Sequence, residues 1–481
     1  MTDDLDDILG AQSPDDEGNA RCAVAMFGPE FRYSAALGWL HYTGHYWRQD
    51  TAEADVDRAI LAVLRQRRLL AVATGKEAIV KATQGSARRL RDCKTIFRSL
   101  VTVEADEFDH SPEMLNVANG VLNLRTRTLT PHCPEQRFTY CIDTPYEPDA
   151  DPSVWLDFLR SVLQDGEDLL AYLQQAVGYT LTGNTSEECL WYVFGPSRSG
   201  KGAFTETLLA LMGTPLATEV DFATFTAKRE GDTQNFDLAP LKPARLIITS
   251  ESNRYENLNT GKIKQLTGGN YIRCAYKHRA HFTYRPQFKA WLVSNHPVSA
   301  DVDDDALWYR VKVIVFPNSH VGKEDKRLKQ LLRTPAVLAG VLRWAVDGAA
   351  AWYESPTGLA HPWAVSSNTR DQRAELDMVQ AWINERCAED DTWTAHSVLY
   401  TDYAGWCKEN GVMPKSARGF TQSLNGKGFK SDVKRVDLKT PRVIVGLKLS
   451  RKCFTYANVS LVSLLSAFSP IERYREKVLN K

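Results

Sequence analysis

The fold is decided by the stretch Leu190-Trp-Tyr-Val-Phe194, which runs directly into Gly195-Pro-Ser-Arg-Ser-Gly200-Lys201-Gly202-Ala203. A short apolar run that ends in a glycine-rich loop and opens a helix is typical of a strand followed by a phosphate-binding loop. Glycines let backbone N–H groups converge on phosphate oxygens, and the lysine adds a full positive charge. The sequence therefore predicts a nucleotide-binding loop made of Gly195, Pro196, Ser197, Arg198, Ser199, Gly200, Lys201, Gly202 and Ala203.

Gly202 departs from the usual pattern of this loop, because Ser or Thr normally stands there and offers a hydroxyl to magnesium. Either a water keeps that place or another oxygen replaces the hydroxyl, and Thr205 is one candidate. With this reservation about the metal, the loop predicts ATP and Mg²⁺ as cofactors.

Polar side chains follow two further apolar runs. Arg245-Leu-Ile-Ile-Thr-Ser ends at Glu251, and Lys289-Ala-Trp-Leu-Val-Ser ends at Asn295. Because ligands bind at the carboxyl edge of a parallel sheet, we expect Glu251 to contact the metal and the attacking water. Asn295 is expected near the γ-phosphate or that water.

Arg310 is expected at the start of a strongly apolar strand that runs to Phe316. A planar, permanently charged guanidinium at such an edge can reach the γ-phosphate of a neighbouring subunit. The alternative is a surface salt bridge with Asp304 or Asp305.

The chain is predicted to be an α/β protein of several domains, because strands alternate with helices in its central part. The helical run Ala54–Arg67 lies in the N-terminal part, and Asp151–Gly183 is expected to be helical. The expected divisions are a disordered acidic tail (1–20), a mixed α+β domain (21–135), an ATPase domain (150–350), a linker (351–370), a DNA-binding domain (371–450) and a basic tail (451–481).

The C-terminal part has the outline of a winged helix. Three helix candidates, Leu376–Cys387, Ser397–Asn410 and Ser416–Asn425, precede a β-rich stretch, Lys434–Leu449. From Lys408 onward there are 16 basic residues against 5 acidic ones, although the whole chain has a formal net charge of zero. We expect this surface to bind duplex DNA, and the alternative is docking of a protein. Its candidate DNA contacts are Lys415, Arg418 and Lys427.

Composition excludes some classes of protein. The sequence contains no apolar run long enough to span a membrane, and its acidic start does not resemble a signal peptide. Nine cysteines without a C-x-x-C pair are typical of reduced thiols in a cytoplasmic protein, in the host cytoplasm if a phage encodes it.

Taken together, these motifs resemble the superfamily III helicases, and more narrowly the poxvirus-type primase-helicase family of phages, plasmids and large DNA viruses. Lys201, Glu251, Asn295 and Arg310 fall within 110 positions, which is compact. Ile263-Lys-Gln-Leu-Thr-Gly-Gly269 is very similar to a family motif, and Asn116–Leu124 and Leu173–Gly183 match the region upstream of the loop. Asn270 stands where Asp is usual in the family, and Ala275 where Arg is common.

The resemblance implies a P-loop, AAA+-like ATPase core. Lys201 would be the Walker A lysine, Glu251 the Walker B acid, Asn295 the polar sensor and Arg310 an arginine finger acting on the next subunit. The segment Arg273–Phe282 would form a hairpin that lines a central pore. The candidate contacts to single-stranded DNA are Lys264, Arg273, Lys277 and His278.

The function that the resemblance implies is an ATP-dependent DNA helicase for replication of a phage or other mobile element. The family's ring is usually a hexamer that moves 3′ to 5′ on single-stranded DNA. One alternative is an origin-binding or regulatory protein that uses ATP as a switch and does not unwind DNA. Another is an assembly protein with a decayed ATP site. Carboxylates for primer synthesis are not evident, so a primase, or a polymerase, is expected on a separate polypeptide.

Overall fold

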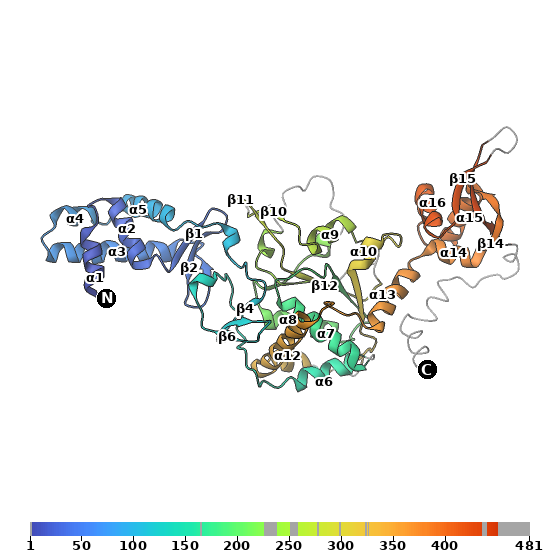
Figure 1. Cartoon of the computed structure of the whole chain (residues 1–481), viewed down its shortest axis with the longest axis horizontal. Helices are drawn as coiled ribbons and strands as arrows, with labels where there is room; N and C mark the ends of the chain where they lie inside the picture. Colours follow the sequence, from blue (N-terminus) through green and yellow to red (C-terminus); the bar gives the residue numbers. More distant parts are fainter. Residues whose placement is uncertain are drawn as a thin grey trace.

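The computed structural model describes residues 2–163, 166–225, 238–250, 258–276, 279–297, 300–322, 325, 327–434 and 440–450. The expected tail 451–481 therefore lies outside the described residues. Helices of the N-terminal part lie at one end of an elongated molecule, a parallel sheet lies in the middle, and the C-terminal part lies at the other end (Figure 1).

The N-terminal part contains five helices and a small antiparallel sheet within its described residues. The helices are α1 (Thr2–Ala11), α2 (Asp16–Phe27), α3 (Ala54–Ala73), α4 (Glu77–Ala82) and α5 (Ala87–Leu100). The sheet consists of β1 (Phe31–Ser34), β2 (Gly38–Tyr42) and β3 (Trp47–Gln49). A second sheet joins β4 (Met114–Val117), β5 (Gly120–Asn123) and β6 (Leu129–Thr130), so the turn and strand expected over Asn116–Leu124 belong to a hairpin.

The prediction that residues 1–20 are disordered is wrong, since α1 and the start of α2 pack on α3. Leu9 is fully buried, and the buried Arg67 guanidinium of α3 donates to the carbonyl oxygen of Leu9 at 3.1 Å. It also donates to Asn19 Oδ1 at 2.7 Å, and Asn19 donates to the carbonyl oxygen of Ala82 at 2.9 Å. The acidic composition of this segment does not show that α1 has an apolar face, on which Leu5 and Leu9 lie together.

The central sheet is parallel throughout and has the strand order β13-β7-β12-β9-β8. Its strands are β7 (Leu190–Phe194), β8 (Ala217–Glu219), β9 (Leu246–Ser250), β12 (Lys289–Ser294) and β13 (Val311–Val315). The mainly parallel sheet predicted from the alternation of strands and helices is confirmed.

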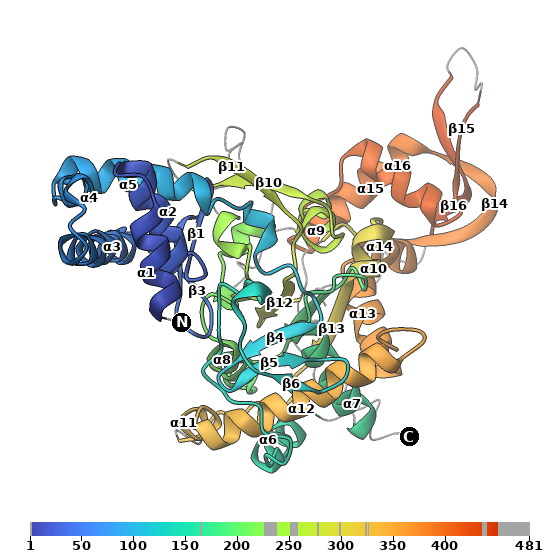
Figure 2. The same ribbon diagram turned by 60° about the vertical axis from the view of Figure 1, so that its left-hand side comes forward.

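Both faces of this sheet are covered. Side chains alternate between the two faces along β7, so its residues show which core lies on each face. Trp191 and Val193 point into a core that they share with α6 (Ser153–Val162), α7 (Gly166–Leu181), α8 (Lys201–Met212) and α12 (Pro335–Glu354). Leu190 and Tyr192 point into the opposite core, which includes α9 (Thr260–Thr267), α10 (Asp305–Arg310) and the hairpin of β10 (Ile272–Ala275) and β11 (His281–Tyr284). Figure 2 shows these two groups on opposite sides of the sheet.

The stretch 351–370, predicted as a linker, is helical at both ends. Helix α12 continues to Glu354, and α13 (Trp363–Glu375) begins further along the chain, after Pro362. The backbone N–H of Val313 donates to Thr369 Oγ1 at 3.0 Å, so α13 is attached to the edge strand β13. Helix α11 (Leu328–Leu332) completes the central helices, and short 3₁₀ turns occur at Ala105–Glu107, Pro134–Gln136, Phe222–Phe225 and Ala239–Leu241.

The C-terminal part has the element order helix, strand, helix, helix, strand, strand. Its elements are α14 (Met378–Arg386), β14 (Cys387–Ala395), α15 (His396–Glu409), α16 (Ala417–Gly426), β15 (Lys430–Val433) and β16 (Arg442–Leu449). The three predicted helices are present, and the strands form an antiparallel sheet in the order β14-β16-β15. Strand β14 was not predicted. Across the described residues, no helix combines the length and the apolarity that crossing a membrane requires.

Helices α7 and α12 approach so closely that glycine is required where they touch. A Cβ atom on Gly178 would lie 2.1 Å from the backbone nitrogen of Ala349, and one on Gly348 would lie 2.1 Å from the carbonyl oxygen of Gln174. Since backbone cannot yield as a flexible side chain can, the contact sets the distance between the two helices.

Replacing Gly178 with Val is therefore expected to destabilise the central part by about 1–3 kcal/mol, because the added carbons overpack a backbone contact. Differential scanning fluorimetry should show a lower unfolding midpoint. Gly405→Ala is the matched control, since a Cβ there would have nothing within 4 Å, and its midpoint should stay the same or rise. An unchanged midpoint in Gly178→Val would contradict the close-contact argument.

Candidate functional site

The glycine-rich loop joins β7 to α8 at the carboxyl edge of the sheet. Gly195 has a φ of 159°, and a Cβ there would lie 2.1 Å from the carbonyl oxygen of Phe316. Gly200 has a φ of 94°, and its Cβ would lie 2.6 Å from Val162 Cγ1. Both positions therefore require glycine for conformation and for space. The backbone N–H of His320 also fastens the loop, since it donates to the carbonyl oxygen of Arg198 at 3.0 Å.

Lys201 begins α8, and its side chain folds back over the loop. Its amine donates to the carbonyl oxygens of Gly195 at 2.8 Å and Pro196 at 2.7 Å, and to Ser199 Oγ at 3.2 Å. These oxygens are all neutral, and burial lowers the pKa of Lys201 to about 8. A buried cation held only by dipoles fits an anionic ligand such as a nucleotide phosphate.

The next residues are those expected around the nucleotide outside the loop, and the strand register shows where Asn295 lies. Asn295 directly follows β12, which pairs with β7, and its side chain is exposed at the same edge of the sheet as the loop. Glu251, predicted as the acidic metal contact, lies outside the described residues. Pro196, Ser197 and Ala203 lie within the loop and the first turn of α8 as expected.

Arg310 lies at the opposite edge of the same sheet. It is the last residue of α10 and not the first of a strand, because the Asp304 side chain caps the helix by accepting from the N–H of Leu307. The predicted alternative of a salt bridge with Asp304 or Asp305 is wrong, since the guanidinium pairs with Glu188. It also donates to the carbonyl oxygen of Ala306 at 3.0 Å, while its buried Nε has no hydrogen-bond partner among the described residues.

The hairpin expected over Arg273–Phe282 is formed by β10 and β11. Arg273 is exposed on β10, and Lys264 is exposed on the neighbouring helix α9. Lys277 and His278, predicted for the tip, lie outside the described residues. Ala275, where the family commonly has Arg, is buried, so a small residue suits its position. Arg279, which no sequence pattern singled out, donates to the carbonyl oxygen of Leu37 and so ties the hairpin to the N-terminal part.

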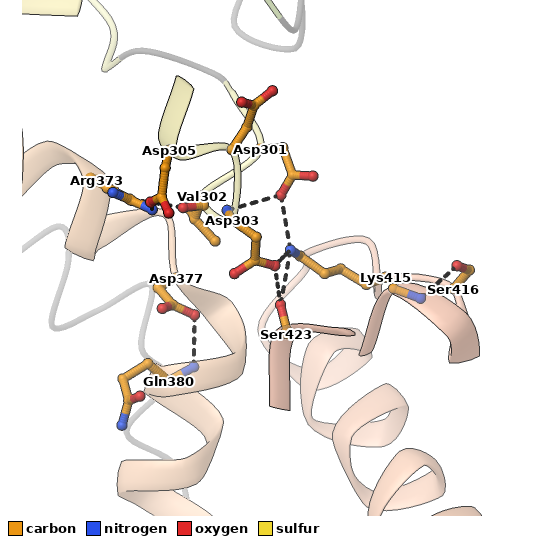
Figure 3. Close-up of polar contacts among 12 residues, drawn as sticks. Asp301, Val302, Asp303, Asp305, Arg373, Asp377, Gln380, Lys415, Ser416 and Ser423 are labelled. Carbon is orange, nitrogen blue, oxygen red and sulfur yellow. Dashed lines mark hydrogen bonds and ion pairs between the residues drawn. The ribbon is translucent and has the colours of Figure 1, made fainter. Parts of the chain in front are cut away.

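Two of the three basic residues predicted to bind DNA in the C-terminal part already have acidic partners. Lys415 Nζ lies 3.0 Å from Asp301 Oδ1 and 2.6 Å from Asp303 Oδ2, and it donates to Ser423 Oγ at 3.1 Å (Figure 3). Lys427 pairs with Asp377. Arg418 is exposed near the start of α16.

The acidic loop Asp301–Asp305 thus connects the C-terminal part to the central sheet. Burial disfavours the charge on Asp303, but the hydrogen bonds from Lys415 and Ser423 outweigh it and hold the pKa of that carboxyl below its ordinary value. On the other side of the loop, Arg373 of α13 pairs with Asp305 (Figure 3). In the sequence this loop is visible as a run of aspartates. The sequence alone did not show that Lys415 is their partner.

Comparison with known proteins shows which families and proteins this chain is similar to. Residues 20–164 match a family described as D5 N terminal like, and residues 193–310 match a family of unknown function, DUF5906. The chain is 25% identical over 440 residues to "Putative helicase L207/L206" of Acanthamoeba polyphaga mimivirus, covering 80% of this chain and 45% of that protein. It is 22% identical over 387 residues to "Putative primase C962R" of African swine fever virus, covering 76% of this chain and 40% of that protein.

These similarities support a primase-helicase family of the D5 type, as the motifs predicted, and the chain spans less than half the length of these two curated relatives. Among solved structures, the C-terminal region of NrS-1 aligns with 88% of this chain and 97% of its own, at 10% identity and a TM-score of 0.48.

The lowered pKa of Lys201 predicts a proton uptake on nucleotide binding. Above pH 8 the free amine loses its proton, whereas bound phosphate favours the charged form and raises the pKa. Calorimetric titration with ATP about half a pH unit above that pKa, in two buffers of different ionisation enthalpy, should therefore show uptake of part of a proton. At neutral pH the uptake should be close to zero. Identical apparent enthalpies in the two buffers at the higher pH would contradict a phosphate contact by Lys201.

Proposed function

We propose that this chain is an ATP-hydrolysing DNA helicase that works as a ring of identical subunits during DNA replication. The observation that carries the proposal is the placement of Lys201 and Arg310 at opposite edges of one parallel sheet. An arginine so placed is directed away from its own phosphate-binding loop, and head-to-tail association would bring it to the loop of the next subunit. The loop that follows β7, a strand flanked by β12 and β13, supports a P-loop core of the AAA+ type.

Each candidate residue has a distinct task in this proposal. Lys201 and the N–H groups of the loop bind the phosphates, and Asn295 holds the γ-phosphate or the attacking water by hydrogen bonds that add no charge. Magnesium, bound together with ATP, neutralises phosphate charge. Arg310 exchanges Glu188 for the γ-phosphate of the adjacent subunit and stabilises the charge that develops there.

Single-stranded DNA is the proposed track. The β10–β11 hairpin, with Arg273 and the nearby Lys264, would face a central pore, where cations follow a phosphate backbone without reading bases. A hexamer that moves 3′ to 5′ is proposed from the family resemblance, together with a primase or polymerase on another polypeptide. The relatives named as helicases and primases support a role in replication, in the cytoplasm of the infected host if the chain is viral.

The C-terminal part is proposed to bind duplex DNA as a winged helix. Its element order and its exposed Arg418 support this assignment.

A second candidate function, an ATP-dependent switch at an origin without unwinding, is favoured by one contact. Lys415 holds the loop that leads into α10, so DNA that captured Lys415 would release the helix that ends in Arg310. Steady-state turnover with and without single-stranded DNA separates a motor from a switch.

A mixing experiment tests the shared site. Lys201→Ala should abolish ATP binding, and Arg310→Ala should bind ATP but lose about 10³-fold or more in turnover. Equal mixing of the two inactive variants should restore activity, because about a quarter of random head-to-tail interfaces would pair an intact loop with an intact arginine. Release of phosphate is the measurement.

Mixing either variant with itself is the control and should restore nothing. If the mixture stays as inactive as its components while both variants assemble, Arg310 does not act on a neighbour. If Arg310→Ala alone hydrolyses ATP normally, it is not a finger at all.

The acidic loop yields a prediction about DNA binding. Asp301→Asn/Asp303→Asn should free Lys415 for phosphate contacts and strengthen duplex binding by about two- to tenfold, since ion pairs at a protein surface contribute roughly 0.2–1 kcal/mol each. Fluorescence anisotropy with a short duplex measures this affinity. Glu17→Gln/Asp92→Asn removes the same net charge from N-terminal helices and serves as the control. Equal gains in both double variants would mean that only net charge matters.

A further inference from the structure

The first turn of α8 lacks the hydroxyl that phosphate-binding loops normally offer to magnesium, because residue 202 is glycine. Thr205, the replacement considered from sequence, does not supply it. Its side chain is buried, and its hydroxyl lies 3.2 Å from the carbonyl oxygen of Lys201 and 3.4 Å from that of Gly202, to which it donates within its own helix. If a side chain of α8 replaces the loop hydroxyl, it must therefore be another residue.

Glu206 places a carboxylate oxygen next to the position that a side chain on residue 202 would occupy. It stands four residues after Gly202, so both residues share one face of α8, and long helical side chains extend back toward the helix start. A Cβ atom on Gly202 would lie 3.7 Å from Glu206 Oε1. A serine hydroxyl at position 202 would thus extend into the space that this carboxylate borders.

The surroundings of Glu206 are built to hold its charge. Lys329 of α11 pairs with Glu206, and Lys329 Nζ would also lie 3.7 Å from a Cβ on Gly202. Arg333 Nη1 lies 3.9 Å from Glu206 Oε2. The two cations offset the repulsion that a carboxylate would otherwise meet from ATP phosphates beside the loop. A carboxylate oxygen is also a ligand that Mg²⁺ prefers, and the ion is usually bound through one or two carboxylates plus substrate phosphates.

We propose that Glu206 takes the place of the missing loop hydroxyl and contacts the magnesium ion that accompanies ATP, directly or through one water of its shell. The inference rests on the proposed nucleotide site and names a metal-binding residue within it. Lys329 and Arg333 act as positioning residues that hold the carboxylate toward the loop.

Nucleotide affinity with and without magnesium tests the proposal independently of turnover. Calorimetry with a non-hydrolysable ATP analogue, in EDTA and then in MgCl₂, gives the increase in affinity that the metal provides. Glu206→Gln keeps the size of the side chain and should leave the affinity in EDTA unchanged, while the magnesium-dependent increase falls about tenfold or more.

A compensating variant shows whether the oxygen itself matters. Gly202→Ser/Glu206→Gln restores a hydroxyl where the common loop has one, and the serine Cβ has no neighbour closer than 3.7 Å. This double variant should recover the magnesium-dependent increase. Glu17→Gln, which breaks an exposed salt bridge with Arg21 in α2, is the matched control and should behave as the unsubstituted chain.

The outcomes separate this proposal from the one on which it rests. If the unsubstituted chain binds the analogue in neither condition, the nucleotide site itself is wrong. If it binds with a magnesium-dependent increase that Glu206→Gln retains, the site stands and the role of Glu206 is overturned. A Glu206→Gln defect that the added serine hydroxyl of the double variant does not repair would assign Glu206 a structural role and overturn the proposal as well.

Discussion

Strand β7 pairs in parallel with β13 on one side and β12 on the other, and all five of its residues are buried. This pairing sets the direction in which every loop of the central part leaves the sheet. The glycine turn after Phe194 and the amide of Asn295 emerge at one edge because their strands run the same way. Arg310 directly precedes β13 and lies at the other edge for the same reason. Strand direction thus places Arg310 and the phosphate-binding loop of one subunit at opposite edges of the sheet. No rearrangement of side chains within that subunit would bring them together.

Sequence reasoning was strongest where local chemistry and tertiary packing agree. Leu190–Phe194 was predicted with correct bounds, because an apolar run ended by a required glycine leaves little choice of structure. The predicted strands around Ile247 and Trp291 are present for the same reason. Likewise, the residue types of the glycine-rich loop and of Lys201 were enough to predict the geometry of the loop.

The predictions failed where long-range contacts decide. Helices α1 and α2 contain an acidic segment, yet a buried arginine more than forty residues away in the sequence orders it. Strand β14 has polar residues over much of its length and is stabilised by pairing with β16, so its residues alone show no clear alternation. Arg310 was placed in a strand because the apolar run hid the helix cap at Asp304. The partners of Lys415 could not be read from the sequence, since they lie more than a hundred positions away.

The guanidinium of Arg67 has a practical consequence for dividing the chain into fragments. It is 1% exposed, and its acceptors are backbone and side-chain oxygens between Leu9 and Asn19. A shortened version that started after those residues would keep the cation and remove its oxygens, leaving a charge in the interior without compensation. Expression boundaries chosen by composition alone would cut there, so a soluble N-terminal fragment should retain the first helix.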